Sequence, residues 1–96
     1  MIGIVAKLTI AAGKEAEFET AATALMAQVV ANEPGAITYQ LYKSKSDPQT
    51  YIFMEQYASQ DDATAHGKTD YFIAAQPKLG PLLAAMPDIQ YYDSVG

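Results

Sequence analysis

The residues of this chain best suited to acid–base chemistry are its only histidine, His66, and a strand carboxylate, Glu55. An imidazole exchanges protons near neutral pH, so it can serve as a base or as a proton relay. Glu55 shares its strand parity with three aromatic residues, Tyr51, Phe53 and Tyr57. If that face meets the helices, loss of water would raise the pKa of the carboxyl group and favour acid–base use. We therefore expect the chemistry to lie in the stretch that contains both residues.

Both residues also fit structural roles, and the sequence leaves these alternatives open. A histidine can cap or pack against a helix surface without any chemical function. A strand glutamate can be satisfied by a cross-strand lysine or by backbone amides. The spacing of Glu55 and His66 does not determine whether their side chains touch.

Aromatic residues form the second candidate group, because their rings can stack on a planar ligand and tyrosine hydroxyls can orient its oxygen atoms. Each one alone is explained by core packing, and only the group suggests an aromatic ligand. The candidates for binding are Tyr39, Phe53, Tyr57, Tyr71 and Phe72, and the candidate that assists His66 is Tyr51. Two apolar sets are interpreted as core alone: Phe18, Leu25 and Val29, and Leu82, Leu83 and Met86.

The composition limits the possible classes of protein. At 96 residues the chain is expected to form one domain, 1–96, whose thin core would benefit from self-association. Its six basic residues are all lysine and its net charge is −5, which disfavours nucleic acid and acidic membrane surfaces as partners. Without cysteine, and with a single histidine, no metal site is expected within one chain. The first residues lack the basic leader of a signal peptide, and no stretch approaches the roughly 20 apolar residues that span a bilayer. The expected location is therefore the cytoplasm.

Hydrophobic periodicity predicts the element order β-α-β-β-α-β. Alternating stretches predict strands over residues 2–10, 36–45, 50–58 and 88–95. Helical spacing predicts a first helix over residues 14–31 and a second helical region capped at Ser59 and again at Thr69. That second region is expected to bend or break at Pro77 and to end in an apolar turn over residues 82–86.

This order is the split-βαβ or ferredoxin-like pattern, an α+β fold with a four-stranded antiparallel sheet. One sheet face would carry the helices, and strand alternation places Ile37, Tyr39 and Leu41 together on one face. The other sheet face is too apolar to leave in water, since it holds Val5, Tyr42, Ile52 and Met54. We expect a second copy of the chain to cover this open face and form a homodimer.

Several short motifs, in their order and spacing, resemble the antibiotic biosynthesis monooxygenase domain family, which includes quinol monooxygenases. These motifs are Glu33-Pro34-Gly35 followed by Tyr39, then Pro48, Tyr51 and Phe53, then Glu55 with Tyr57, and Ala65-His66 with Phe72. The resemblance covers nearly the whole chain and implies a dimeric α+β barrel. It implies a cavity in each subunit, lined by strand aromatics and entered by His66. It also implies oxidation of electron-rich aromatic substrates by molecular oxygen without metal, flavin or haem, so no cofactor is expected.

The chain departs from the pattern of some family members. The Asn, Trp and His triad of haem-degrading members would fall at Ala6, Tyr57 and Gln76, and none of the three matches. Many relatives carry a second histidine where this chain has Tyr71, and a tryptophan where it has Tyr57. These departures argue against haem degradation and shift the pocket toward tyrosine hydroxyls.

The leading hypothesis is a cofactor-independent monooxygenase that oxidises a small hydroxylated aromatic or quinol. Triplet oxygen reacts slowly with closed-shell molecules, so a base must first make the substrate electron-rich. His66 would be that base, assisted by Tyr51 and Glu55. An isomerase of a small hydroxyketone on the same fold is the nearest alternative, and it predicts a smaller, more polar pocket. A non-catalytic dimeric binding protein is the third, and it predicts a solvent-facing His66 and no enclosed cavity.

Overall fold

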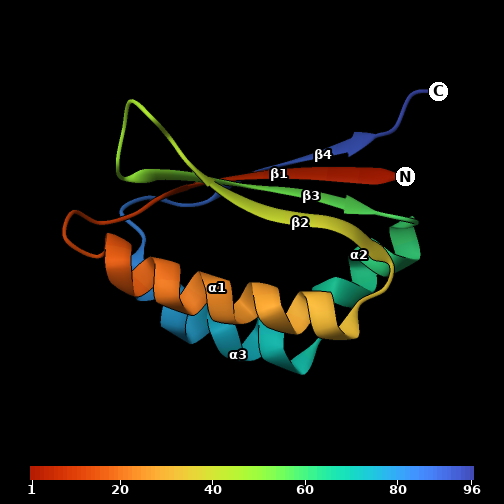
Figure 1. The fold of residues 1–96 in the computed structure, drawn as a ribbon, viewed down its shortest axis with the longest axis horizontal. Coiled ribbons are helices and arrows are strands. Elements are labelled where there is room, and N and C mark those ends of the chain that lie inside the picture. Colours follow the sequence, from red (N-terminus) through yellow and green to blue (C-terminus); the bar gives the residue numbers. More distant parts are fainter.

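The protein has one helical layer packed on one face of a single sheet, as seen in a computed structural model that describes residues 1–96 (Figure 1). The elements are, in order, β1 (Ile2–Thr9), α1 (Glu15–Asn32), β2 (Ala36–Lys43), β3 (Thr50–Tyr57), α2 (Gln60–His66), α3 (Asp70–Leu79), a 3₁₀ turn η1 (Gly80–Leu82) and β4 (Asp88–Asp93). The four strands pair antiparallel in the order β2-β3-β1-β4. The predicted ferredoxin-like α+β fold is therefore confirmed.

Alternation along the two central strands produces the inner sheet face. In β1, Ile4, Ala6 and Leu8 are buried while Lys7 is exposed, because successive side chains point to opposite faces. In β3, the buried residues are the predicted set, Tyr51, Phe53, Glu55 and Tyr57. The helical layer meets this face with one stripe of α1, which consists of Phe18, Ala22, Leu25 and Val29. The predicted α1 stripe is thus part of the core.

A β-bulge in β2 contradicts the prediction that Ile37 shares a face with Tyr39 and Leu41. The register with β3 shifts between Ala36 and Thr38, so Ile37 has no residue opposite it. Tyr39 is buried, whereas Ile37 is 56% exposed. The extra residue breaks the two-residue alternation, and simple parity fails on its N-terminal side.

The second helical region divides into α2 and α3, as the two predicted caps require. The Ser59 hydroxyl accepts a hydrogen bond from the Asp62 amide at 3.2 Å, and the Thr69 hydroxyl accepts one from the Phe72 amide at 3.3 Å. Of the two outcomes expected at Pro77, a bend or a break, the helix does not break there, because α3 continues to Leu79. Pro77 lies near the end of the helix, where its missing N–H removes a single backbone hydrogen bond.

The chain after α3 also differs from the predicted apolar turn. Leu82 is 4% exposed and Leu83 packs against the core, but Met86 is 90% exposed, so its core assignment was wrong. The backbone is already extended at Leu83, which bridges to Ile10. This extension carries the chain out of the helical layer and toward β4 at the sheet edge.

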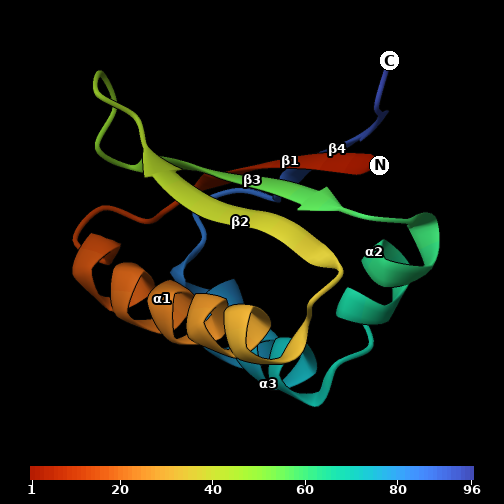
Figure 2. The same cartoon turned by 45° about the vertical axis from the view of Figure 1, so that its right-hand side comes forward.

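The outer sheet face carries no helix, because α1, α2 and α3 all lie on the same side (Figure 2). We call this surface the open face, and its apolar residues are Val5, Tyr42, Ile52, Met54 and Tyr92. Tyr42, Met54 and Tyr92 are each about half exposed, at 52%, 46% and 55%. Not one helix combines the length and the hydropathy needed to cross a membrane.

Candidate active site

A cavity of about 420 Å³, which we call the inner cavity, lies between the inner sheet face and helices α2 and α3. Its sheet wall includes Tyr39, Phe53 and Glu55, and its helix wall includes His66 and Phe72. Hydrophobic residues make up 12 of the 20 that line it. Ligand pockets of comparable volume, in the range of about 300 to 1,000 Å³, are typically apolar with a few placed polar groups. The cavity can therefore hold a small aromatic molecule.

His66 enters this cavity as the last residue of α2 and is only 6% exposed. Its ring packs among three aromatic rings, with centroid distances of 5.2 Å to Tyr39, 5.6 Å to Tyr57 and 4.7 Å to Phe72. The Nε2 atom lies 3.5 Å from the Tyr39 hydroxyl. The histidine is thus held inside the fold with one ring nitrogen close to a cavity-lining phenol.

The other ring nitrogen of His66 is bound by Glu33, a residue that the sequence analysis names only within the Glu33-Pro34-Gly35 motif and not as a candidate for the site. The Nδ1 atom lies 3.1 Å from each carboxylate oxygen of Glu33. Glu33 follows the end of α1, and its side chain is 12% exposed. The Tyr71 hydroxyl donates a hydrogen bond to the same carboxylate. No spacing rule links residues 33 positions apart, so the sequence carried no signal for this pair.

Glu55 is the second titratable group of the cavity and is 8% exposed. Burial raises the pKa of its carboxyl group, although the hydrogen bond that Tyr57 donates to Oε1 at 2.7 Å acts in the opposite direction. Burial likewise raises the pKa of the Tyr39 and Tyr57 hydroxyls, and the nearby Glu55 adds to both shifts. These phenols therefore stay protonated and act as hydrogen-bond donors. His66 bonds to Glu33 and Tyr39, whereas Glu55 bonds to Tyr57, so His66 and Glu55 have different hydrogen-bond partners.

The raised pKa of Glu55 predicts a pH-dependent stability. A folded-state pKa above the ordinary 4.5 means that the folded protein binds this proton more tightly than the unfolded chain does. The stabilisation is complete below the unfolded pKa and is lost as the pH rises through the folded pKa. Glu55→Gln can still accept the Tyr57 hydrogen bond but cannot ionise. We expect this variant to be more stable than wild type at neutral pH, with the difference vanishing below about pH 4.

Urea unfolding across this pH range measures the effect. The matched control is Glu17→Gln, which removes an exposed acid on α1. A Glu55→Gln variant that is less stable than wild type at neutral pH would contradict the assignment of burial as the dominant cause.

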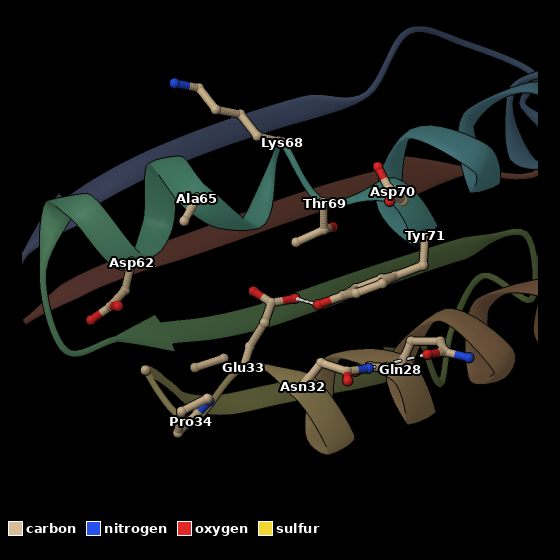
Figure 3. A pocket seen from close by; sticks show the side chains of 12 residues that line it. Gln28, Asn32, Glu33, Pro34, Asp62, Ala65, Lys68, Thr69, Asp70 and Tyr71 are labelled. Atoms are coloured by element: carbon tan, nitrogen blue, oxygen red, sulfur yellow. Dashed lines mark hydrogen bonds between the residues drawn. The ribbon is translucent and has the colours of Figure 1, made fainter.

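The remaining candidates from the sequence fall in different places. Tyr39, Phe53 and Phe72 line the cavity. Tyr57 is not part of the lining and donates a hydrogen bond to Glu55. Tyr71 lines a separate outer pocket of about 700 Å³ (Figure 3). Tyr51 is not brought to the cavity: its ring packs 4.8 Å from that of Phe18, and its hydroxyl donates to Glu19. The structure thus separates Tyr51 from the residues it was expected to assist.

The fold and the site together define a class: a ferredoxin-like α+β domain whose internal, mostly apolar cavity contains a buried histidine and a buried carboxylate. More particularly, the chain belongs to the antibiotic biosynthesis monooxygenase family, whose family model matches residues 1–78.

Solved structures extend the likeness over the whole chain. A Caulobacter crescentus CB15 protein, provisionally assigned as an antibiotic biosynthesis monooxygenase, is 47% identical with a TM-score of 0.96, over 99% of this chain and 90% of that chain. A conserved protein from Methanosarcina mazei Go1 is 25% identical with a TM-score of 0.90, over 95% of this chain and 89% of that one. A Nitrosomonas europaea protein with the same provisional assignment is 21% identical with a TM-score of 0.94 over 100% of both chains, which supports the fold alone. Among curated proteins, no match to this chain is found.

Proposed function

We propose that this protein is a cofactor-independent monooxygenase that oxidises a small hydroxylated aromatic, such as a quinol or an anthrone, with molecular oxygen. The observation that carries the proposal is a buried imidazole next to a phenol in a mostly apolar cavity large enough for aromatic rings. Membership of the monooxygenase family supports the reaction class.

His66 begins the reaction by removing one proton, from the hydroxyl group of a quinol or from the CH₂ carbon of an anthrone, which leaves an electron-rich anion. This anion transfers one electron to oxygen, and the resulting substrate radical and superoxide combine to form a peroxide on the substrate. In an anthrone, loss of water from that peroxide leaves one oxygen atom as the new carbonyl, and the second oxygen atom departs in the water. The substrate supplies all the electrons, so the balance needs no external reductant.

The other polar groups of the cavity stabilise the anion before oxygen reacts. The Tyr39 hydroxyl is kept protonated by burial and can donate a hydrogen bond to the developing oxyanion. Glu55, whose pKa is raised by burial, is a second acid–base group on the same wall. The apolar lining excludes water, which strengthens both interactions and protects the radical pair.

The two alternative functions fit the site less well. An isomerase of a small hydroxyketone calls for a smaller, more polar pocket, whereas 12 of the 20 lining residues here are hydrophobic. A non-catalytic binding protein calls for a solvent-facing histidine and no cavity, whereas His66 is 6% exposed and lines a cavity of about 420 Å³.

Oxygen uptake by metal-free protein, measured with a panel of quinols and anthrones, tests the function. We expect protein-dependent oxygen consumption equal to the product formed and one atom of ¹⁸O₂ in each product molecule. A panel without turnover would reject the proposal. Interconversion of a hydroxyketone in the absence of oxygen would instead support the isomerase.

We also propose that a second copy of the chain covers the open face and completes a dimeric α+β barrel. Three of its apolar side chains, Tyr42, Met54 and Tyr92, are about half exposed in the single chain, and such a contiguous patch is rarely left in water. The one lysine on this face, Lys7, lies opposite Asp88 on the neighbouring strand. The face is therefore nearly neutral and suits self-association.

Met54→Lys places a charge in the middle of the open face and is expected to convert the dimer to a monomer, because burying an unpaired charge is costly. Light scattering at micromolar concentration measures the mass. Val30→Lys is the matched control, since Val30 is 78% exposed on α1, away from the open face. A monomeric wild-type protein, or a Met54→Lys variant that stays dimeric, would contradict this interface.

A further inference from the structure

Glu33 connects the outer pocket with the inner cavity. It lines the outer pocket together with Tyr71, and its carboxylate also contacts His66, which lines the inner cavity. Figure 3 shows the Glu33 carboxylate directed from the end of α1 toward the Tyr71 hydroxyl at the start of α3. One carboxylate therefore links three segments: the end of α1, the end of α2 and the start of α3.

The hydrogen bonds determine which nitrogen of His66 carries the proton. A carboxylate only accepts hydrogen bonds, and both oxygens of Glu33 lie 3.1 Å from Nδ1, so a neutral ring must place its hydrogen on Nδ1. The Nε2 atom then presents its lone pair as an acceptor toward the hydroxyl of Tyr39, 3.5 Å away, a residue that lines the cavity. An uncharged imidazole with the opposite tautomer would set two lone pairs against each other at Glu33.

We infer that Glu33 is a positioning residue that holds His66 in the Nδ1–H tautomer and aims the Nε2 lone pair at the cavity. The mechanistic meaning of this role rests on the proposed function, because only a reaction that needs a base uses that lone pair. When Nε2 takes a proton, the ring becomes a cation beside a carboxylate that is already in contact with it. Glu33 thus both orients the base and stabilises its protonated form, without touching the substrate.

Four titratable side chains surround the His66 ring. Glu33 faces its Nδ1 side, Tyr39 its Nε2 side, and Glu55 and Tyr57 lie on the adjoining strand, with the Tyr57 ring centroid 5.6 Å away. Only Glu33 forms a hydrogen bond to Nδ1. Glu33 therefore fixes the hydrogen on Nδ1, and the Tyr39 hydroxyl, as a donor to Nε2, favours the same tautomer from the other side of the ring.

The sole histidine makes a direct test possible, because the imidazole region of a ¹H–¹⁵N spectrum contains signals from one ring only. At about pH 8.5, where an ordinary imidazole is neutral, the two nitrogen shifts report the tautomer. We expect the Nδ1–H form in the wild-type protein and loss of its dominance in Glu33→Ala. Tyr71→Phe, which removes the other donor to the same carboxylate, should keep the Nδ1–H form.

Oxygen uptake gives the second readout, with an expected rate loss of about 10²- to 10⁴-fold in Glu33→Ala, the range typical of a lost general base. A wild-type ring in the Nε2–H form would overturn the inference, and this measurement does not depend on the stability of any variant. An unchanged spectrum in Glu33→Ala would also overturn it. Failure of the whole substrate panel with the expected tautomer intact would reject the proposed function but leave the structural role of Glu33 standing.

Discussion

Replacing His66 with alanine is expected to lower the rate of oxygen uptake by about 10²- to 10⁴-fold, the usual contribution of a positioned general base. The side chain lies at the cavity wall and is bound on both ring nitrogens, so its removal takes away the base and leaves Tyr39 and Glu33 without their partner. Steady-state oxygen consumption with any substrate that the wild-type protein turns over measures the loss.

Added imidazole separates a chemical role of His66 from a structural one. The truncation leaves ring-sized space next to the cavity, so free imidazole should restore part of the rate if the missing group is a base. A His66→Ala variant at the wild-type rate would reject the mechanism. A slow variant that folds normally but is not rescued would point instead to a packing role for the ring.

The same assay tests the assisting role expected for Tyr51. The structure places this residue against Phe18, with its hydroxyl bound to Glu19 and outside the cavity lining. Tyr51→Phe keeps the ring and removes only the hydroxyl, so its rate should stay close to wild type. A large loss would mean that Tyr51 reaches the site in a way that the single chain does not reveal.

Replacing Phe18 with alanine is expected to give the largest loss of stability, about 3 to 5 kcal/mol. Phe18 is fully buried on α1, and its ring centroid lies 4.8 Å from that of Tyr51 on β3. The truncation loses apolar burial and leaves a void where the helical layer meets the sheet. Natural domains have about 5 to 15 kcal/mol of total stability, so this change removes a large share of it.

Urea unfolding at one fixed protein concentration measures the loss, since dimerisation would make stability depend on concentration. Phe18→Leu is the matched control and should cost less than about 1.5 kcal/mol, because it conserves most of the volume. Phe18 does not line the cavity, so the folded fraction of either variant should keep its oxygen uptake. A loss below about 1 kcal/mol in Phe18→Ala would contradict the central position of this ring in the core.

The sequence by itself determined the order of elements, the inner sheet face and the helix caps. Each of these depends on local chemistry: alternation in β1 and β3, helical spacing in α1, and hydroxyl side chains at Ser59 and Thr69. Strand alternation likewise predicted that Glu55 shares a sheet face with Phe53. The family resemblance added that His66 should approach this face from a helix, and the structure places it there.

Only the tertiary structure decided which inward-facing residues share one cavity. Periodicity reports the side of an element that faces the core but not the position along it, which is why Tyr51 and Phe53 share a face while only Phe53 lines the cavity. A single bulge at Ile37 and an extended backbone at Leu83 changed local faces that parity and helical spacing had assigned otherwise. The contact between Glu33 and His66 joins residues 33 positions apart, one just after the end of α1 and the other at the end of α2. Such a contact depends on how the end of α1 packs beside α2, and no local pattern in the sequence encodes that distance.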